Sequence, residues 1–122
     1  MSVTVEKTGG GRAEITWDPT RDDSRGYLAR SVESDQLAFA LESLSQDGSA
    51  APTVPADYAL SMAQHTAALA RLLERRAAVQ VVHLRDHYGM SWRQIAGAIL
   101  DDPERQSSVR RMYDSGRRHI GI

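Results

Sequence analysis

The stretch from Tyr88 to Arg118 constrains the fold of this chain most, because it combines a helix break with two helix starts. Gly89 follows an apolar-periodic run, where a helix often ends in the left-handed conformation that glycine adopts at little cost. Ser91 and Gln94 have the spacing of a capping box, in which each side chain bonds the other residue's backbone amide. A helix is therefore predicted to begin at about Trp92.

The predicted helix has apolar residues at i, i+3, i+4 and i+7, which places them on one inward face. These residues are Trp92, Ile95, Ala96 and Ile99. The helix is expected to stop at Asp101-Asp102-Pro103, because the residue before a proline is pushed out of the helical region.

A second helix is predicted after this stop, with Asp102 as its N-cap and Pro103 as its first residue. It should run to about Gly116, with Val109, Met112 and Tyr113 facing inward. Its other face is basic, since the segment 105–122 holds five arginines and one acidic residue.

Guanidinium groups on an exposed helix match phosphate oxygens and the O6/N7 edge of guanine. Helix, short turn and basic helix is also the arrangement that puts a helix into the major groove of DNA. We therefore expect binding to double-stranded DNA. The side chains predicted to contact it are Arg105, Gln106, Ser107, Arg110, Arg111, Arg117 and Arg118.

The segments Leu84–Leu100 and Ser107–Tyr113 resemble the helix-turn-helix of bacterial DNA-binding proteins, of the sigma-factor region 4 type. A Gly-x-Ser-Trp/Tyr-x-x-Ile-Ala run opens the first helix of the pair in that family. The residues that match this run are Gly89, Ser91, Trp92, Ile95 and Ala96, and Val109 matches the inward residue of the second helix. The resemblance covers roughly the last 45 residues and implies a recognition helix there.

One departure from that family concerns the turn, which is usually about four residues long and built around a glycine. Here the longer segment Leu100–Ser107 intervenes, and it is acidic at its start. Two interpretations follow from the residues: either the turn is longer, or the recognition helix begins earlier, at Pro103.

Charge is distributed unevenly along the 122 residues, although the net charge is only −1. The segment 1–70 has five basic and ten acidic groups, and the segment 71–122 has ten basic and six acidic groups. This asymmetry favours nucleic acid as the partner of the basic end. Fourteen arginines against one lysine are typical of a GC-rich bacterial or phage genome.

The N-terminal part of the chain is predicted to contain a β-hairpin, a loop and a helix. Val3–Lys7 and Ala13–Trp17 alternate apolar and polar residues around three glycines, which predicts a β-hairpin. The segment 18–30 is predicted to be an irregular, solvated loop. A helix is expected over Asp35–Ser45, with an inward face formed by Leu37, Ala38, Leu41 and Leu44.

The predicted fold class is mainly α, with a helix-turn-helix bundle at the C-terminus and a small N-terminal β-hairpin plus helix. We expect an N-terminal unit over residues 1–46, a linker over 47–56, and a DNA-binding domain over 57–122. The segment 56–88 lacks Gly and Pro, so it is one long helix or two helices with a bend near Arg75-Arg76. One apolar stripe, expected to cover the hairpin or to pair with its copy in a second chain, consists of Leu69, Leu72, Leu73 and Ala77. A second stripe, expected to belong to the helix-turn-helix core with Ile95, Ile99 and Val109, consists of Val81, Leu84 and Tyr88.

Several residues have a structural interpretation beside a functional one. His83 and His87 lie at i, i+4, but without a third ligand they are more often surface histidines than a metal site. Trp92 and Tyr113 lie on apolar stripes and are predicted to be core residues rather than base-stacking ones. For Arg75-Arg76, a solvated helix face is slightly favoured over a phosphate contact.

The sequence therefore predicts a sequence-specific DNA-binding protein, acting as a bacterial transcriptional regulator and as a homodimer through the long helix or the N-terminal unit. The alternatives are a phage or plasmid accessory protein in packaging, replication or partition, and an adaptor or antitoxin that uses its acidic N-terminal half. Without cysteines there are no disulfides or zinc fingers. No constellation indicates an enzyme, a metal or a cofactor. No membrane span or signal segment is evident, so we expect a cytoplasmic protein.

Overall fold

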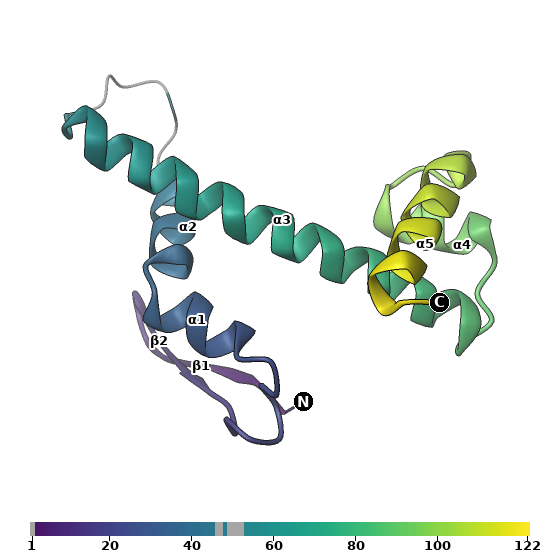
Figure 1. The fold of residues 1–122 in the computed structure, drawn as a ribbon, viewed down its shortest axis with the longest axis horizontal. Coiled ribbons are helices and arrows are strands. Elements are labelled where there is room, and N and C mark those ends of the chain that lie inside the picture. Colours follow the sequence, from purple (N-terminus) through teal and green to yellow (C-terminus); the bar gives the residue numbers. More distant parts are fainter. Residues whose placement is uncertain (1, 46–47, 49–52) are drawn as a thin grey trace. The chain divides into compact units, whose positions relative to one another are not determined.

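The structure is a computed structural model that describes residues 2–45, 48 and 53–122. Within these residues it has five helices and an N-terminal two-strand antiparallel hairpin, which confirms the predicted mainly helical fold class (Figure 1). The elements are β1 (Thr4–Gly9), β2 (Arg12–Thr16), α1 (Tyr27–Glu33), α2 (Gln36–Ser45), α3 (Ala56–Asp86), α4 (Trp92–Ile99) and α5 (Gln106–Ile120).

The chain forms two compact units, one up to Leu69 and one from Ala70, and α3 contributes to both. Half of the predicted linker, residues 47 and 49–52 of the range 47–56, lies outside the described residues. Among the residues that the structure describes, no helix is both long enough and apolar enough to cross a membrane.

The first unit opens with the predicted hairpin. Its two strands pair in antiparallel register with Val5 opposite Ile15. Gly11, in the turn, has a φ of 75°, a left-handed conformation that a residue with a Cβ rarely adopts. The glycine run therefore serves the turn between the strands, as its position in the sequence predicts.

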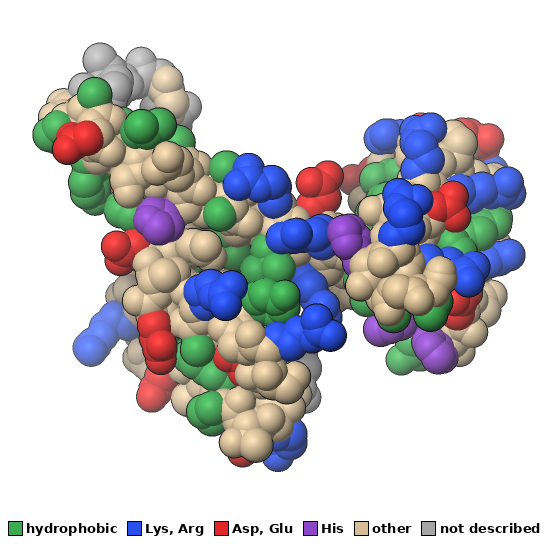
Figure 2. Space-filling view, in the orientation of Figure 1, with side chains coloured by type: hydrophobic (Ala, Val, Ile, Leu, Met, Phe, Trp, Pro, Cys, Tyr) green, Lys and Arg blue, Asp and Glu red, His purple; other side chains and the backbone are tan. Residues whose placement is uncertain are grey.

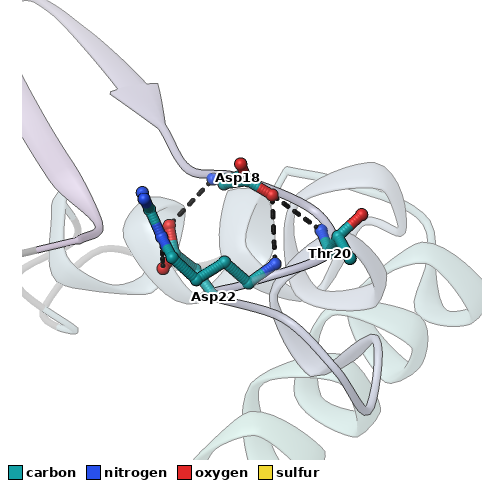
Figure 3. A network of polar contacts seen from close by, with 4 residues as sticks. Asp18, Thr20 and Asp22 are labelled. Carbon is teal, nitrogen blue, oxygen red and sulfur yellow. Dashed lines mark hydrogen bonds and ion pairs between the residues drawn. The ribbon is translucent and has the colours of Figure 1, made fainter.

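The segment after the hairpin is more ordered than the predicted irregular loop, because aspartate side chains bond its backbone (Figure 3). The Asp22 carboxylate accepts from the Asp18 amide, and the Asp18 carboxylate accepts from the Thr20 amide, both at 2.9 Å. Arg21 donates to Asp22 at 3.1 Å. The pKa of Asp22 is held below its usual value, mainly by this bond from Arg21 and secondly by the bond from the Asp18 backbone.

The same segment contains the start of α1, which corrects the prediction that residues 18–30 are irregular throughout. The Asp23 carboxylate accepts from the amides of Leu28 and Ala29, both at 2.9 Å. These amides belong to the first turn of α1 and have no partner within the helix. Asp23 therefore caps α1 from three residues before its Gly26 N-cap.

The inward face of α2 differs from the predicted one. Leu41 and Leu44, expected inside, are 55% and 81% exposed. Phe39 instead packs on the first part of α3, edge-to-face with Tyr58 at 5.6 Å and stacked with His65 at 5.3 Å between ring centroids. Apolar residues surround most of this short helix, so its periodicity did not decide which side would face α3.

The third helix settles an alternative that the sequence left open. α3 is one uninterrupted helix of 31 residues, without the break considered near Arg75-Arg76. Gly89 follows its end with a φ of 65°, as predicted for a residue just past a helix. The Met90 amide donates back to the Leu84 carbonyl at 3.1 Å, which fixes the turn towards α4.

The core of the second unit is formed by three helices, each of which contributes one large, fully buried side chain. These are Val81 from α3, Ile95 from α4 and Val109 from α5. The prediction was correct for these residues and for Ala96. It was wrong for Ile99 and Tyr88, which are 39% and 74% exposed.

Both exposed residues lie at helix ends. Ile99 is in the last turn of α4, and Tyr88 follows the end of α3. At these positions the neighbouring helices of the core no longer cover them.

Gly116 was expected near the end of the last helix, but it lies inside α5 and is buried. A Cβ built on it would lie 2.3 Å from the Ala78 carbonyl oxygen and 2.8 Å from a Val82 methyl group. The backbones of α3 and α5 therefore approach closely here, and glycine allows that approach. The helix ends instead at Gly121, whose φ is 87°.

Candidate nucleic-acid interface

The start of α4 is fixed by the predicted capping box. The Gln94 amide donates to the Ser91 hydroxyl at 3.1 Å, and the Ser91 amide donates to the Gln94 side-chain oxygen at 2.9 Å. Two of the backbone amides without a partner at this helix start are thereby satisfied. The box holds α4 in a fixed relation to the turn that follows α3.

The connection from α4 to α5 is the longer turn of the two alternatives. The sequence predicts that Asp102 caps α5, and this prediction is wrong. The Asp102 carboxylate accepts from the Glu104 amide at 3.0 Å, and its carbonyl accepts from the Arg105 amide at 3.1 Å. These bonds form a separate turn at Pro103, so α5 begins only at Gln106. The prediction that Pro103 opens the helix was therefore wrong.

An ion pair ties this turn to α4. The Arg93 guanidinium lies 2.6 Å from the Glu104 carboxylate, and both groups are exposed. An exposed pair of this kind contributes at most about 1 kcal/mol to stability. It nevertheless restricts the loop immediately before α5 and neutralises one of its acidic groups.

The predicted contact residues are brought together on one helix and its N-terminal flank. Arg105 is the N-cap of α5, Gln106 its first residue, and the other five lie within it. Ser107, Arg111 and Arg118 share the face opposite the core, because i, i+4 and i+11 align on a helix. Arg110 and Arg117, at i and i+7, lie together on one flank of that face.

The flank of Arg110 rests on an aromatic pair. The Trp92 and Tyr113 rings meet edge-to-face at 5.2 Å, and both pack on the core, which confirms the prediction that they are core residues. The guanidinium of Arg110 lies over the Trp92 ring at 5.5 Å, and that of Arg117 over the Tyr113 ring at 5.8 Å. Cation–π attraction therefore favours defined positions for both arginines.

A further arginine supports this aromatic pair, and sequence reasoning missed it. Arg85, from the last turn of α3, lies over the Trp92 ring at 4.4 Å and donates to the Met90 carbonyl at 3.0 Å. Trp92 is thus contacted by guanidinium groups from two different helices. No spacing in the sequence indicates this, because the contact depends on how α3 and α5 both approach α4.

Tyr113 also joins α5 to α3 through a hydrogen bond. Its hydroxyl donates to the Asp86 carboxylate at 2.7 Å. This bond raises the pKa of Tyr113 above the ordinary value of 10.0, since ionising the phenol would place a second negative charge beside Asp86. The Arg117 flank of α5 is thereby fixed to the end of α3.

Arg111 reaches from the outer face of α5 towards the flank opposite Arg110. It donates to the Ser108 hydroxyl at 3.2 Å and lines an open cavity between α5 and the α3 residues Arg71 and Arg75. Arg110 and Arg111, adjacent in sequence, therefore serve different sides of the helix. Arg76, the neighbour of Arg75, is exposed and does not line this cavity.

Within the part of the chain that the structure describes, no ion pair neutralises the arginines of α5. Among the described residues, ion pairs are formed by Arg21 with Asp22 and by Arg93 with Glu104, and none involves the five arginines of the segment 105–122. Figure 2 shows basic side chains over α5 on the visible face of the second unit. The arrangement can accept several anionic groups along one helix.

Histidines give no comparable cluster. The His83 and His87 rings meet edge-to-face with centroids 5.5 Å apart. Within the described part of the chain, no three His, Cys, Asp or Glu side chains gather as metal ligands do.

Comparison with known proteins gave no match among protein-family models, curated proteins or solved structures.

Proposed function

We propose that this protein binds double-stranded DNA sequence-specifically, with α5 as the recognition helix in the major groove, and that it acts as a transcriptional regulator. The observation that carries the proposal is the set of five arginines on α5 and its N-cap, none of which is paired with a carboxylate among the described residues. A capped short helix, a turn and a basic helix over a shared core suit insertion into the groove.

The residues divide into two roles under this proposal. Arg105, Gln106 and Ser107 lie at the start of α5, and Arg111 follows on its outer face, where base edges are read. Arg110 and Arg117, resting on aromatic rings at the flank, contact backbone phosphates. The aromatic support restricts the side chains before binding, so less conformational entropy is lost on contact.

Asp114 is the one acidic residue in the segment 105–122, and it lies on the same face of α5 as Ser107, Arg111 and Arg118. A carboxylate there repels phosphates, so it opposes binding to DNA of arbitrary sequence. It can also accept from the amino group of cytosine. Asp114 therefore favours discrimination between sequences over general affinity.

We also propose that the protein acts as a homodimer, because operators are commonly read as paired half-sites. The support lies in the first unit, where Leu41 and Leu44 expose apolar side chains on α2. Sedimentation of wild-type protein should give twice the mass of the chain. The double variant Leu41→Glu/Leu44→Glu should sediment as a monomer if this helix forms the contact.

DNA binding can be tested by fluorescence anisotropy with a random duplex and with the duplex upstream of the protein's own gene, at two salt concentrations. Tight binding to one sequence, weakened steeply by salt, is the expected result. Arg111→Ala should cost about 1–3 kcal/mol on the preferred sequence if the residue reads a guanine. Arg25→Ala, a matched exposed arginine in the first unit, should leave the affinity unchanged.

The outcomes separate the alternatives. Equal, weak binding to both duplexes would favour an accessory role in packaging, replication or partition. No binding at low salt, with a basic protein co-purifying, would favour the adaptor interpretation based on the acidic N-terminal half.

A further inference from the structure

The second unit contains an open cavity of about 710 Å³ between α3 and α5, a size within the usual range for small-molecule sites. Its wall is basic: Arg71 and Arg75 come from successive turns of α3, and Arg111 faces them from α5. Of the described residues, Glu74 is the only one with a carboxylate that lines it. Three guanidinium groups therefore share the cavity with one acidic group.

Among the residues that the structure describes, these arginines have no ion-pair partner. No ion pair formed by the described residues includes Arg71, Arg75 or Arg111. Like charges at i and i+4 on a helix repel one another, and Arg71 and Arg75 have this spacing. An anion bound between them and Arg111 would relieve this repulsion and find charge-assisted hydrogen bonds in a forked geometry.

The floor of the cavity has a different character. We call floor the apolar part of the lining, which consists of Ala78, which is buried, and of the half-buried side chains of Leu100 and Met112. Ser108 and Ser115 also line the cavity. A few polar groups converging over an apolar floor are typical of a site that orients an organic ligand.

We propose that this cavity binds a small organic anion, with a carboxylate or phosphate between the three arginines and an apolar body on the floor. A phosphate of the DNA backbone fits the rim less well as its main occupant, because it brings no apolar group to Ala78, Leu100 and Met112. The proposal that the cavity binds an anion does not require that the protein binds DNA.

One consequence does rest on the proposed function. Arg111 lines the cavity and also lies on the outer face of α5, so a bound anion competes for a side chain that reads DNA. Occupancy of the cavity should therefore weaken specific DNA binding.

The test is an amide NMR titration of the full chain with 1-naphthoate as the probe. Two control ligands test the charge and the apolar ring of naphthoate one at a time. The alcohol 1-naphthalenemethanol has the same ring without the charge, and inorganic phosphate has a negative charge without the ring. Saturable shifts at Ala78, Met112 and Ser115 are expected with naphthoate, with each control binding at least about fivefold more weakly.

Variants locate the site. Arg71→Gln and Arg75→Gln should each weaken naphthoate binding about twofold to fivefold, as for an exposed ion pair. Arg76→Gln, which removes a neighbouring arginine outside the cavity, should leave it unchanged. Circular dichroism of each variant checks that α3 remains folded.

Three results would overturn the proposal: no saturable shifts, equal binding of the neutral alcohol, or equal binding of inorganic phosphate. A fourth concerns DNA. If Arg71→Gln and Arg75→Gln each lower the slope of log K against log salt by about 0.9, these arginines contact DNA phosphates instead. Because the naphthoate titration contains no DNA, it tests anion binding in the cavity even if the protein proves not to bind DNA.

Discussion

Replacing Gly116 by alanine should destabilise the second unit, although alanine is the better helix former. The new Cβ would lie 2.3 Å from the Ala78 carbonyl oxygen and 2.6 Å from its carbonyl carbon. These are backbone atoms of α3, so no side chain can turn away. The helices must separate by about 1 Å to reach ordinary contact, which loosens a close-packed core.

The expected magnitude follows from two opposing effects. Overpacking of this kind costs about 3 kcal/mol, at the upper end of its usual range, because the contact is with backbone. The gain in helix propensity from glycine to alanine returns about 1 kcal/mol. We therefore expect a net loss of about 2 kcal/mol in the free energy of unfolding.

Gly97 provides the matched control, since it also lies inside a helix of the same unit. A Cβ there would meet only Pro103 side-chain carbons, at 3.5 and 3.9 Å, which is ordinary contact. Gly97→Ala should therefore stabilise the protein by about 0.5–1 kcal/mol. The two substitutions are chemically identical and are expected to change stability in opposite directions.

The assay is urea unfolding followed by the fluorescence of Trp92, in a Trp17→Phe background so that Trp92 is the one remaining tryptophan. A midpoint that falls for Gly116→Ala and rises for Gly97→Ala, with similar m-values, is the expected result. If Gly116→Ala is as stable as its parent, α3 and α5 do not approach closely at this position, and the account of the core is refuted.

Three further substitutions test other parts of the second unit. Asp114→Asn should raise the affinity for random duplex at low salt, because a charge that repels phosphate is removed; an unchanged affinity would mean that Asp114 does not face DNA. Tyr113→Phe should destabilise the protein at neutral pH. The pKa of Tyr113 is raised by its bond to Asp86, so its contribution is fully present below the unfolded value of 10.0 and lost as pH rises through the folded value. The stability difference between wild type and Tyr113→Phe should therefore close in strong alkali, and urea unfolding at pH 8 and 11 would detect a difference that persists. Ser91→Ala should cost about 1 kcal/mol in the same assay through loss of the capping box, whereas Ser107→Ala, an exposed serine within α5, should be nearly neutral.

Features written in a few neighbouring residues could be predicted from the sequence. The turn at Gly89, the capping box of Ser91 and Gln94, and the hairpin with its glycine turn all depend on local chemistry. The three-helix core around Val81, Ile95 and Val109 could be predicted as well, because its apolar periodicity is regular.

Features that depend on contacts between distant segments could not be predicted. The sequence predicts a helix end at Gly116, because nothing near it in the sequence indicates the Ala78 carbonyl against which it packs. The sequence predicts Asp102 as the cap of α5, because the residues near it allow its carboxylate either to cap that helix or to accept from the Glu104 amide. The cavity joins Arg71 and Arg111, which only the packing of α3 on α5 brings together.

The sequence predicts the candidate contact residues as a group, but it does not predict which side of α5 each of them serves. Their arginine content and helical spacing identified α5, and the structure then assigned Arg110 to the flank over Trp92 and Arg111 to the cavity side. This separation arises because adjacent residues on a helix point about 100° apart. Sequence reasoning treated the two as one pair.

The salt dependence of DNA binding tests the central claim, that α5 contacts DNA, most directly. The slope of log K against log salt on a random duplex would be measured for wild type and for Arg110→Gln/Arg117→Gln, which removes the two flank arginines. We expect a steep wild-type slope that falls by about 1.8 in the variant, since each lost phosphate contact removes about 0.9. An identical slope in the two proteins would contradict the account and place the DNA, if it binds, elsewhere on the molecule.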